Sequence, residues 1–282
     1  MADPLPRLTD RPALLRQRRR AEAAGMAGFL HAAAAAELKE RLAEVNRTFT
    51  APAVVTGFPG LWAGVLPGAR IVPDAEVLDL APGAHDLVVH ALALHWADDP
   101  VGQLVQCRRA LVPDGLFLGA LFGGRSLQEL RAALAAAEAE VSGGLSPRVV
   151  PMAEIRDLGG LLQRAGFALP VADAAVQTVS YADIFALMRD LRAMGETNAM
   201  AARRRVPLRR GVLARAAEIY ARRWPAPEGR IAATAETIWL TGWAPAPSQP
   251  RPLRPGSAAA RLADALGVAE RPAGDPAAPG AD

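Results

Sequence analysis

Residues 53–64, AVVTGFPGLWAG, carry the residue types of a loop that holds a nucleotide-like cofactor. A short apolar run leads into glycines, which let the backbone approach a ligand, and helix-forming residues follow. Gly57 and Gly60 are the candidate cofactor contacts in this turn. Pro59 stands between them with a fixed φ and no N–H to donate, and no acidic residue precedes the turn. The segment is therefore a working cofactor loop, a degenerate one or an ordinary turn.

A second set of polar side chains follows two other apolar runs. Asp74 comes after the run ARIV, and His95 and Trp96 close the run that ends in LHW. Polar residues at the carboxyl ends of parallel strands commonly meet ligands, and a histidine there can exchange a proton near neutral pH. Asp74 is therefore a candidate ligand contact or a solvated loop acid. His95 is a candidate catalytic residue or a structural one.

The segment MGETN, residues 194–198, places two polar side chains directly after an apolar helix. Glu196 and Asn198 are candidate catalytic or substrate-contacting residues, because a carboxylate and an amide can hydrogen-bond a substrate. Gly195 in the same segment is also typical of a helix C-cap, so a purely structural function is the alternative.

The elements that would position these residues follow from hydrophobic patterning. Four short apolar runs between residues 51 and 125 are bounded by Gly, Pro and Asp, and their alternation with helical segments favours a parallel sheet covered on both faces. Residues 145–244 add amphipathic helices, a strand near 170–181 and a final strand near 230–245. Residues 11–48 are expected to be helical, and Leu30, Leu38, Leu42 and Val45 recur at a spacing that gives one apolar stripe. We therefore expect an α/β fold.

Composition excludes several classes of protein. The chain has 282 residues, 51% of them hydrophobic, and no apolar run of the roughly 18 residues that a membrane span needs. The acidic, proline-bearing start MADPLPRLTDRP is unlike a signal peptide, so a cytoplasmic bacterial protein is expected. Cys107 is the single cysteine, which rules out an internal disulfide and a cysteine-based metal cluster within the chain, and no metal is expected.

Arginine dominates the basic residues without giving a large net charge. The pI is near 9.7, the formal net charge is +3, and Lys39 is the sole lysine among 32 basic residues. This skew is typical of coding in a GC-rich genome, and nucleic-acid binding is not expected. A cluster near the start of the chain could bind phosphate or an acidic partner, or could form a solvated helix face. It consists of Arg16, Arg18, Arg19 and Arg20.

Several segments, in order along the chain, resemble those of one protein family. They are ALALHWADDP (91–100), ALVPDGLFLGALFGGRSLQELR (110–131), GGLSPRV (143–149), DLGGLLQRAGF (157–167), LMRDLRAMGETNA (187–199), IWLTGWAP (238–245) and RPGSAAARL (254–262). The chain resembles the methyltransferase-like family that includes mitochondrial respiratory complex I assembly factor 5 and its alphaproteobacterial relatives. The resemblance implies a Rossmann-like class I S-adenosylmethionine-dependent methyltransferase fold. It also implies a protein partner, a peripheral-arm subunit of complex I, and the mitochondrial member is held to hydroxylate an arginine rather than to methylate.

The same resemblance implies a cofactor site at the carboxyl ends of the first strands. The turn of Gly57 and Gly60 would approach the methionine part of S-adenosylmethionine, and Asp74 would face its adenine. His95 and Trp96 would lie where the substrate approaches, and they are candidate cofactor contacts as well.

One part of this fold is missing from the sequence. The stretch from Gly60 to Ile71 is too short for the helix, strand and helix expected there, which need roughly 25 residues. We therefore expect a fold shortened by about one strand–helix unit near residues 60–70. The acid that holds the cofactor ribose would be lost with that unit, and Val55 replaces the acid that precedes the turn. A lost charge-assisted hydrogen bond costs about 1.5–3 kcal/mol, so the loop is interpreted as degenerate.

Three regions and two functions are expected. The regions are a basic helical segment at 1–48, a methyltransferase-like domain at 49–246 with a helical insertion around 181–224, and a proline-rich, partly disordered tail at 247–282. The first function is an S-adenosylmethionine-dependent, methyltransferase-like protein that acts on or binds a protein in complex I assembly. The alternative is a catalytically inactive binding and assembly factor that no longer binds the cofactor. Nucleic-acid binding would instead require a contiguous basic face.

Overall fold

The computed structural model describes residues 7–250 and, beyond them, residues 264 and 267. All the elements discussed below belong to the compact unit Met1–Ala246. Of the predicted tail at 247–282, the part after residue 250 lies outside the described residues apart from those two positions.

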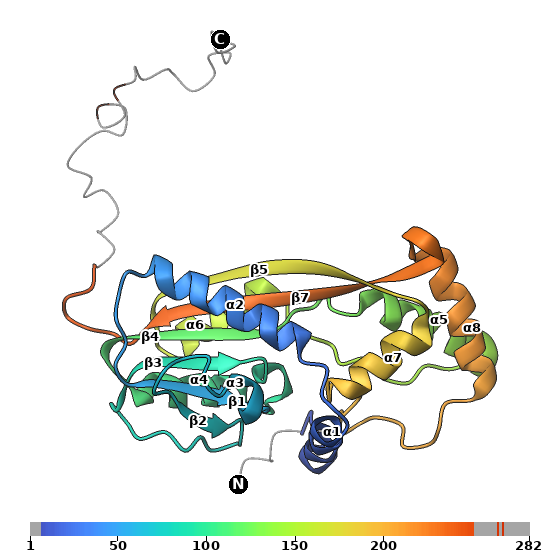
Figure 1. Ribbon diagram of the computed structural model, residues 1–282, viewed down its shortest axis with the longest axis horizontal. Coiled ribbons are helices and arrows are strands. Elements are labelled where there is room, and N and C mark those ends of the chain that lie inside the picture. Colours follow the sequence, from blue (N-terminus) through green and yellow to red (C-terminus); the bar gives the residue numbers. More distant parts are fainter. Residues whose placement is uncertain (1–6, 251–263, 265–266, 268–282) are drawn as a thin grey trace. The chain divides into compact units, whose positions relative to one another are not determined.

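Seven strands of the described chain form one mixed sheet (Figure 1). They are β1 (Pro52–Thr56), β2 (Arg70–Pro73), β3 (His85–Ala91), β4 (Leu111–Phe122), β5 (Ala168–Tyr181), β6 (Pro225–Ala226) and β7 (Arg230–Trp243). Their order is β2-β1-β3-β4-β7-β5, with β6 paired to β7. Strands β2, β1, β3 and β4 run parallel, whereas β7 runs antiparallel to both β4 and β5. The predicted α/β fold is confirmed.

The parallel part of the sheet is short. Strand β2 lies directly beside β1, with Val55 opposite Val72. The connection between these two strands contains one short helix, α3 (Pro59–Trp62), and in the described chain β2 pairs with no strand other than β1. The expected loss of a strand–helix unit near residues 60–70 is therefore confirmed. It brings Asp74 next to the end of β1, where its N–H donates to the carbonyl of Thr56 at 3.2 Å.

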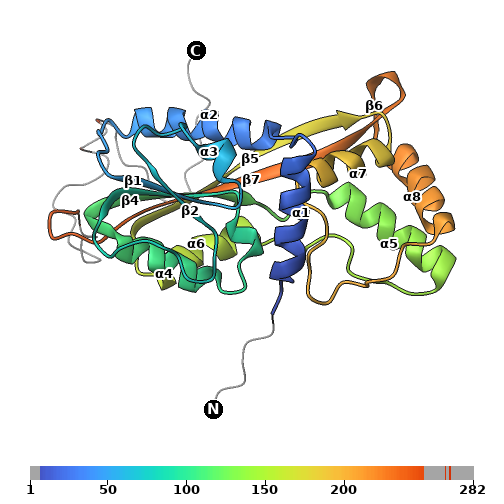
Figure 2. The same cartoon turned by 60° about the horizontal axis from the view of Figure 1, so that its bottom comes forward.

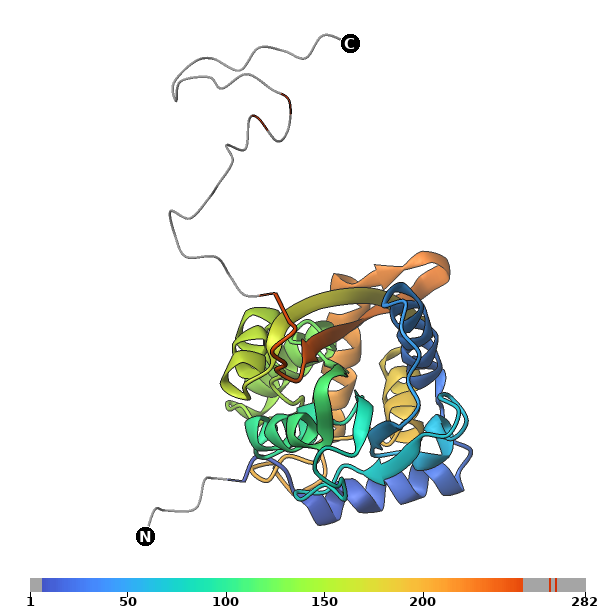
Figure 3. The same ribbon diagram turned by 90° about the vertical axis from the view of Figure 1, so that its left-hand side faces the viewer.

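Helices lie on both faces of this sheet and beyond the ends of its strands. They are α1 (Arg11–Ala23), α2 (Phe29–Glu44), α4 (Pro100–Ala110), α5 (Gln128–Ser142), α6 (Ile155–Arg164), α7 (Ile184–Ala193) and α8 (Arg210–Arg223), with short 3-10 turns η1 (Leu94–Trp96) and η2 (Pro227–Gly229). Helices α2 and α3 pack against one face, which includes Val54 and Leu118, and α4 and α6 against the other, which includes Val55 and Phe117. Neighbouring strand residues point to opposite faces, so β1 contributes to both cores. Figures 2 and 3 show helices on either side of the sheet.

A separate core lies beside the long antiparallel strands. Helices α5, α7 and α8 pack together around Leu130, Leu187 and Tyr220, and against Ile231 at the start of β7. In Figure 1 this group sits around the ends of β5 and β7 that extend past the parallel strands. Helices α7 and α8 come between β5 and β7 in the sequence, within the segment 181–224 where a helical insertion is expected.

Residues 11–48 were expected to be helical, and they form the two helices α1 and α2. The break falls at 24–28, where Gly25 has a φ of +82°, a conformation that favours glycine. The N–H of Ala27 then donates to the carbonyl of Ala193, at the end of α7, at 3.1 Å. Because of this break, α2 lies over the sheet, whereas α1 lies beyond the arrowheads of β1 and β2 (Figure 1).

Candidate functional site

Two arginines of α1 reach the acid that follows β2. Arg18 donates from Nη1 to both carboxylate oxygens of Asp74, at 2.8 and 2.9 Å. Arg11 donates from Nη1 to Asp74 Oδ2 at 3.1 Å and from Nη2 to the Asp74 carbonyl at 2.6 Å. Two helical turns separate the arginines, so both lie on the face of α1 that meets the ends of the strands. Helix α1 is therefore fastened across this edge of the sheet.

The ion pair between Arg18 and Asp74 is buried. The two side chains are each 3% exposed, whereas that of Arg11 is 29% exposed. Burial by itself opposes ionisation of the Asp74 carboxyl, but the charges of Arg18 and Arg11 and the hydrogen bonds that they donate outweigh it. The pKa of Asp74 consequently lies below its ordinary value, and the carboxylate stays charged at neutral pH.

Gly57, the first glycine of the candidate cofactor turn, makes room for Arg18. A Cβ added at Gly57 would lie 2.2 Å from Cζ of Arg18, closer than any real contact. The guanidinium also lies over the ring of Phe58, 5.3 Å from its centroid. Gly195 serves the same packing from the other side, since a Cβ there would lie 2.9 Å from Cζ of Phe58 and 3.2 Å from Cα of Arg18. Gly60, in contrast, is exposed in α3 with open space around its Cα.

His95 and Trp96 were expected to close a strand, but β3 ends at Ala91 and they lie in the 3-10 turn η1 that follows, where they meet Glu196. Trp96 Nε1 donates to Glu196 Oε2 at 2.8 Å, and His95 Nε2 lies 3.4 Å from the same oxygen. Gly195 has a φ of +74° and the N–H of Glu196 donates to the carbonyl of Leu191, so this segment also caps α7. The structural and the functional interpretation of MGETN therefore both have a basis in the geometry.

Glu196 retains unused hydrogen-bonding capacity. Its Oε1 and the Nδ1 atom of His95 are buried and have no hydrogen-bond partner in the described chain. Burial opposes ionisation of this carboxyl too, but the hydrogen bond and charge of His95, the charge of Arg18 and the Trp96 hydrogen bond lower the pKa of Glu196. The result is a buried negative charge with one free acceptor oxygen.

Asn198 has its amide committed to the backbone. Its Nδ2 donates to the carbonyl of Pro147 at 2.9 Å, and its Oδ1 accepts from the N–H of Met200 at 3.0 Å. The backbone carbonyl of Asn198 accepts from Gln17 of α1 at 3.3 Å. Asn198 thus joins three segments around the site, although it also lines the larger cavity described below.

Two buried histidines support the same edge of the sheet. His31 Nδ1 accepts from Trp62 Nε1 at 3.0 Å, and His90 pairs through Nε2 with Oε1 of Gln103 at 2.7 Å. Burial lowers the pKa of each to about 4. Both imidazoles are therefore neutral at pH 7 and serve as packed hydrogen-bonding groups.

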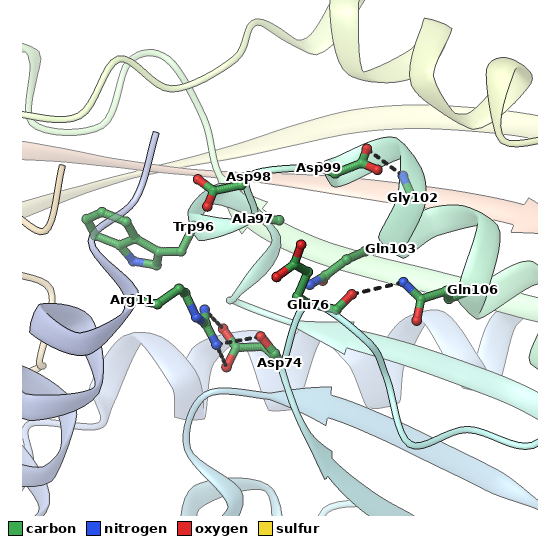
Figure 4. A pocket seen from close by; sticks show the side chains of 10 residues that line it. All are labelled: Arg11, Asp74, Glu76, Trp96, Ala97, Asp98, Asp99, Gly102, Gln103 and Gln106. Carbon is green, nitrogen blue, oxygen red and sulfur yellow. Dashed lines mark hydrogen bonds and ion pairs between the residues drawn. The ribbon is translucent and has the colours of Figure 1, made fainter. Parts of the chain in front are cut away.

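The space left on the Asp74 side is small. A pocket of about 90 Å³ lies there, and Figure 4 shows the ion pair between Arg11 and Asp74 at its wall. Glu76 and Gln103 also line it, close to the end of β2. Since a water in the liquid takes about 30 Å³, this pocket has room for only a few waters.

The space on the Glu196 side is larger and mostly apolar. A cavity of about 440 Å³ lies between α5, α7 and the segments that follow them. Leu130, Leu134 and Leu191 supply apolar walls, while Trp96 and Glu196 line one end. A cavity of this size with a few polar groups is typical of a site for a side chain or a small ligand.

Other kinds of chemistry find no support in the part of the chain that the structure describes. There, no group of three or more His, Cys, Asp or Glu side chains is placed to hold a metal ion. None of the helices described is both long and apolar enough to cross a membrane. Cys107 is buried in α4, and burial raises the pKa of its thiol to about 12, so it is a core residue and not a nucleophile.

The structure thus groups the sequence candidates in two sets. Gly57 and Asp74 both contact Arg18, whereas His95, Trp96 and Glu196 contact one another; Asn198 lies beside the second set and Gly60 lies apart. Sequence reasoning did not identify Arg11 and Arg18 as part of the site.

A sequence signal for Arg18 was present. Arg18 shares the buried face of α1 with Ala13, Leu14 and Ala21, which recur at helical spacing. A solvated face is therefore the wrong interpretation for Arg18, although Arg16, the next basic residue before it, is exposed.

Four parallel strands continued by an antiparallel strand, with a glycine turn after β1 and a polar cluster at the carboxyl ends, define a class I methyltransferase-like protein. Residues 27–119 match the family described as "Methyltransferase domain". The chain belongs to a methyltransferase family, as its similarity to a malonyl-[acyl-carrier protein] O-methyltransferase shows, and it is also similar to the mitochondrial arginine-hydroxylase NDUFAF5.

Individual relatives show how far this similarity extends. The NDUFAF5 proteins of Danio rerio and Homo sapiens are 38% and 40% identical to the chain over 71% and 68% of its length. The chain covers 62% and 56% of those two proteins, less than two thirds of their length. A malonyl-[acyl-carrier protein] O-methyltransferase from Halorhodospira halophila is 34% identical, over 72% of the chain and 67% of that enzyme. Among solved structures, the YcgJ protein of Bacillus subtilis aligns with a TM-score of 0.45 at 13% identity, over 75% of the chain and 98% of YcgJ.

Proposed function

We propose that this chain is a methyltransferase-fold binding protein that takes part in respiratory complex I assembly and no longer binds S-adenosylmethionine. One observation carries the proposal: the guanidinium of Arg18 fills the space over Gly57 while it pairs with Asp74. Arg18 and Asp74 therefore fill the space in which the cofactor would lie, so the cleft does not fit the cofactor, while Nε and Nη2 of Arg18 stay buried without a hydrogen-bond partner in the described chain.

Binding of the cofactor would break the buried Arg18–Asp74 pair. A cofactor that approached Gly57 would have to displace Arg18 and leave Asp74 with only the partly exposed Arg11. Separating a buried ion pair costs about 3–5 kcal/mol, and each 1.4 kcal/mol is about a factor of ten in affinity. The penalty would weaken cofactor binding by more than about a hundredfold.

The 440 Å³ cavity supports the binding half of the proposal. Its apolar walls suit the stem of a long side chain, and the free Oε1 of Glu196 is an acceptor suited to a cationic group. The name of the NDUFAF5 relatives, arginine-hydroxylase, points to arginine as that side chain. We therefore propose that the partner is an arginine-bearing segment of a complex I peripheral-arm subunit.

Calorimetric titration of the purified chain with S-adenosylmethionine, repeated with S-adenosylhomocysteine, tests the loss of the cofactor. No heat is expected up to millimolar ligand, and micromolar binding would overturn the proposal. Arg18→Ala, checked for folding by circular dichroism, should show a gain of binding if Arg18 is the obstacle. Arg19→Ala is the matched control, because Arg19 is exposed on the same helix.

A second candidate function is modification of the bound protein, and the buried His95–Glu196 pair beside the cavity favours it. Incubation of recombinant peripheral-arm subunits with the chain and S-adenosylmethionine, followed by mass spectrometry, distinguishes the two. Added methyl groups or oxygen atoms that require Glu196 would favour an enzyme. Stable complex formation without any mass change would favour the binding protein.

A further inference from the structure

A second basic site lies on the side of α1 that faces away from the strands. Four arginines from three segments line a cavity of about 160 Å³. They are Arg16 and Arg20 of α1, Arg192 at the end of α7, and Arg203 in the segment after it. The polar side chains of Gln17 and Thr197 complete the lining.

Three of the four arginines of this cavity carry a positive charge that no acidic side chain of the described residues pairs with. Arg203 pairs with Asp10, with Nη2 2.8 Å from Oδ2. Arg16, Arg20 and Arg192 form no ion pair with any residue that the structure describes. Like charges held near one another repel, and an anion placed between them relieves that repulsion.

The walls of the cavity are held in place before any ligand arrives. Arg203 donates to the carbonyl of Met200 at 2.8 Å, and Gln17 donates to the carbonyl of Asn198 at 3.3 Å. The N–H of Asp10 donates to the carbonyl of Ala199 at 2.7 Å. The last two bonds tie the segment after α7 to α1 and its N-cap, so the backbone around the cavity is already fixed when an anion binds.

We propose that this cavity binds a phosphate-type oxyanion, either free or as a phosphate ester. Guanidinium groups match the oxygens of phosphate, and the hydroxyl of Thr197 supplies a further donor. At about 30 Å³ per water, the cavity has the room of several waters, which suits one phosphate group. The site is separate from the Arg18–Asp74 pair, so it does not depend on whether the chain binds S-adenosylmethionine.

The site adjoins the larger cavity. Arg192, Thr197 and Arg203 line both spaces. A phosphate ester could therefore place its phosphate among the arginines and its remainder in the apolar cavity, whereas free phosphate would occupy the basic site alone.

Isothermal titration of the whole chain with sodium phosphate, at constant ionic strength set by sodium chloride, tests the proposal. Saturable binding is expected, and it should be tighter at pH 8 than at pH 6 because the dianion predominates there. The double variant R20Q/R192Q should bind at least about tenfold more weakly, the loss expected for two charge-assisted contacts. R222Q should bind phosphate as the wild type does, because Arg222 is exposed on α8 and does not line this cavity.

Phosphoserine titrated in parallel identifies the source of the anion. Tighter binding of phosphoserine would indicate an ester, and tighter binding of inorganic phosphate would indicate the free ion. The proposal would be overturned if neither phosphate nor phosphoserine bound saturably. It would also be overturned if wild type and R20Q/R192Q bound with equal affinity while thermal melting showed that both proteins are folded.

Discussion

The two sides of the candidate site differ in what fills them. On the side of Asp74, side chains of α1 occupy the space and leave a pocket of about 90 Å³ with charged walls. On the side of Glu196, the packing of α5 and α7 leaves a cavity of about 440 Å³ with mostly apolar walls. The same fold is thus filled by side chains of α1 on the Asp74 side and left open on the Glu196 side.

The shortened sheet gives a physical reason for this difference. Because β2 pairs directly with β1, Asp74 follows β2 at the position next to the glycine turn. An ionised carboxylate buried there needs a partner, and α1 supplies Arg18. The Glu196 side is built from other elements, so the deletion leaves its cavity in place.

Breaking the buried pair should have the largest effect. Arg18→Met removes the main partner of a buried carboxylate, and we expect the free energy of unfolding to fall by about 3–5 kcal/mol in urea titration. The double variant R18M/D74N should recover part of that loss, because no unpaired charge remains. Arg19→Met is the control, and a loss in R18M no larger than in this control would contradict the closed-side argument.

Acid should weaken the closed side next. Burial depresses the pKa values of His31 and His90 from 6.5 to about 4, so the unfolded chain binds more protons than the folded chain between these values. The free energy of unfolding should therefore fall as pH drops through this window, by up to about 1.4 kcal/mol per pH unit for each histidine. The lowered pKa of Asp74 adds a further loss below its ordinary value of 3.8.

Urea titrations at pH 8, 6 and 5 check this prediction. His90→Gln should flatten the slope by about half, since one of two equally shifted groups is removed. A curve without slope between pH 6.5 and 4.5 would show that neither histidine is buried as described.

A smaller effect is expected on the open side. Glu196→Gln keeps an oxygen for Trp96 but removes the charge of that hydrogen bond, so we expect a loss of about 1–2 kcal/mol in the free energy of unfolding. The near-ultraviolet circular dichroism of the tryptophans reports whether Trp96 keeps its position. If Glu196→Gln lowered the free energy of unfolding more than Arg18→Met does, the buried charge of Glu196 would matter more for stability than the Arg18–Asp74 pair.

The smallest effect is expected where neither side is involved. Arg215 pairs with Glu140 at 2.6 Å on exposed helix faces, with side chains 34% and 49% exposed. Surface pairs contribute little because water and salt screen them, so the free energy of unfolding of Arg215→Gln should equal that of the wild type within error. A clear loss in the same urea titration would mean that surface ion pairs matter in this chain as much as the buried one.

The comparison also separates what local patterns predict from what they do not. The apolar runs predicted the strands, the spacing between Gly60 and Ile71 predicted the missing unit, and the polar residues after strands identified Asp74 and His95 as candidates. The helical character of residues 11–48 was predicted, but the turn between α1 and α2 at Gly25 was not. Periodicity reports which residues share a face but not where a chain turns.

The sequence by itself determined the α/β fold, its shortened parallel part and the positions of the polar candidates, because these depend on residue types at short spacing. Only the tertiary structure decided that Arg18 pairs with Asp74 over Gly57 and that Glu196 meets Trp96. These contacts join residues far apart along the chain, and their partners depend on how α1 and α7 pack against the ends of the strands. That packing is a property of the whole core and not of any local segment.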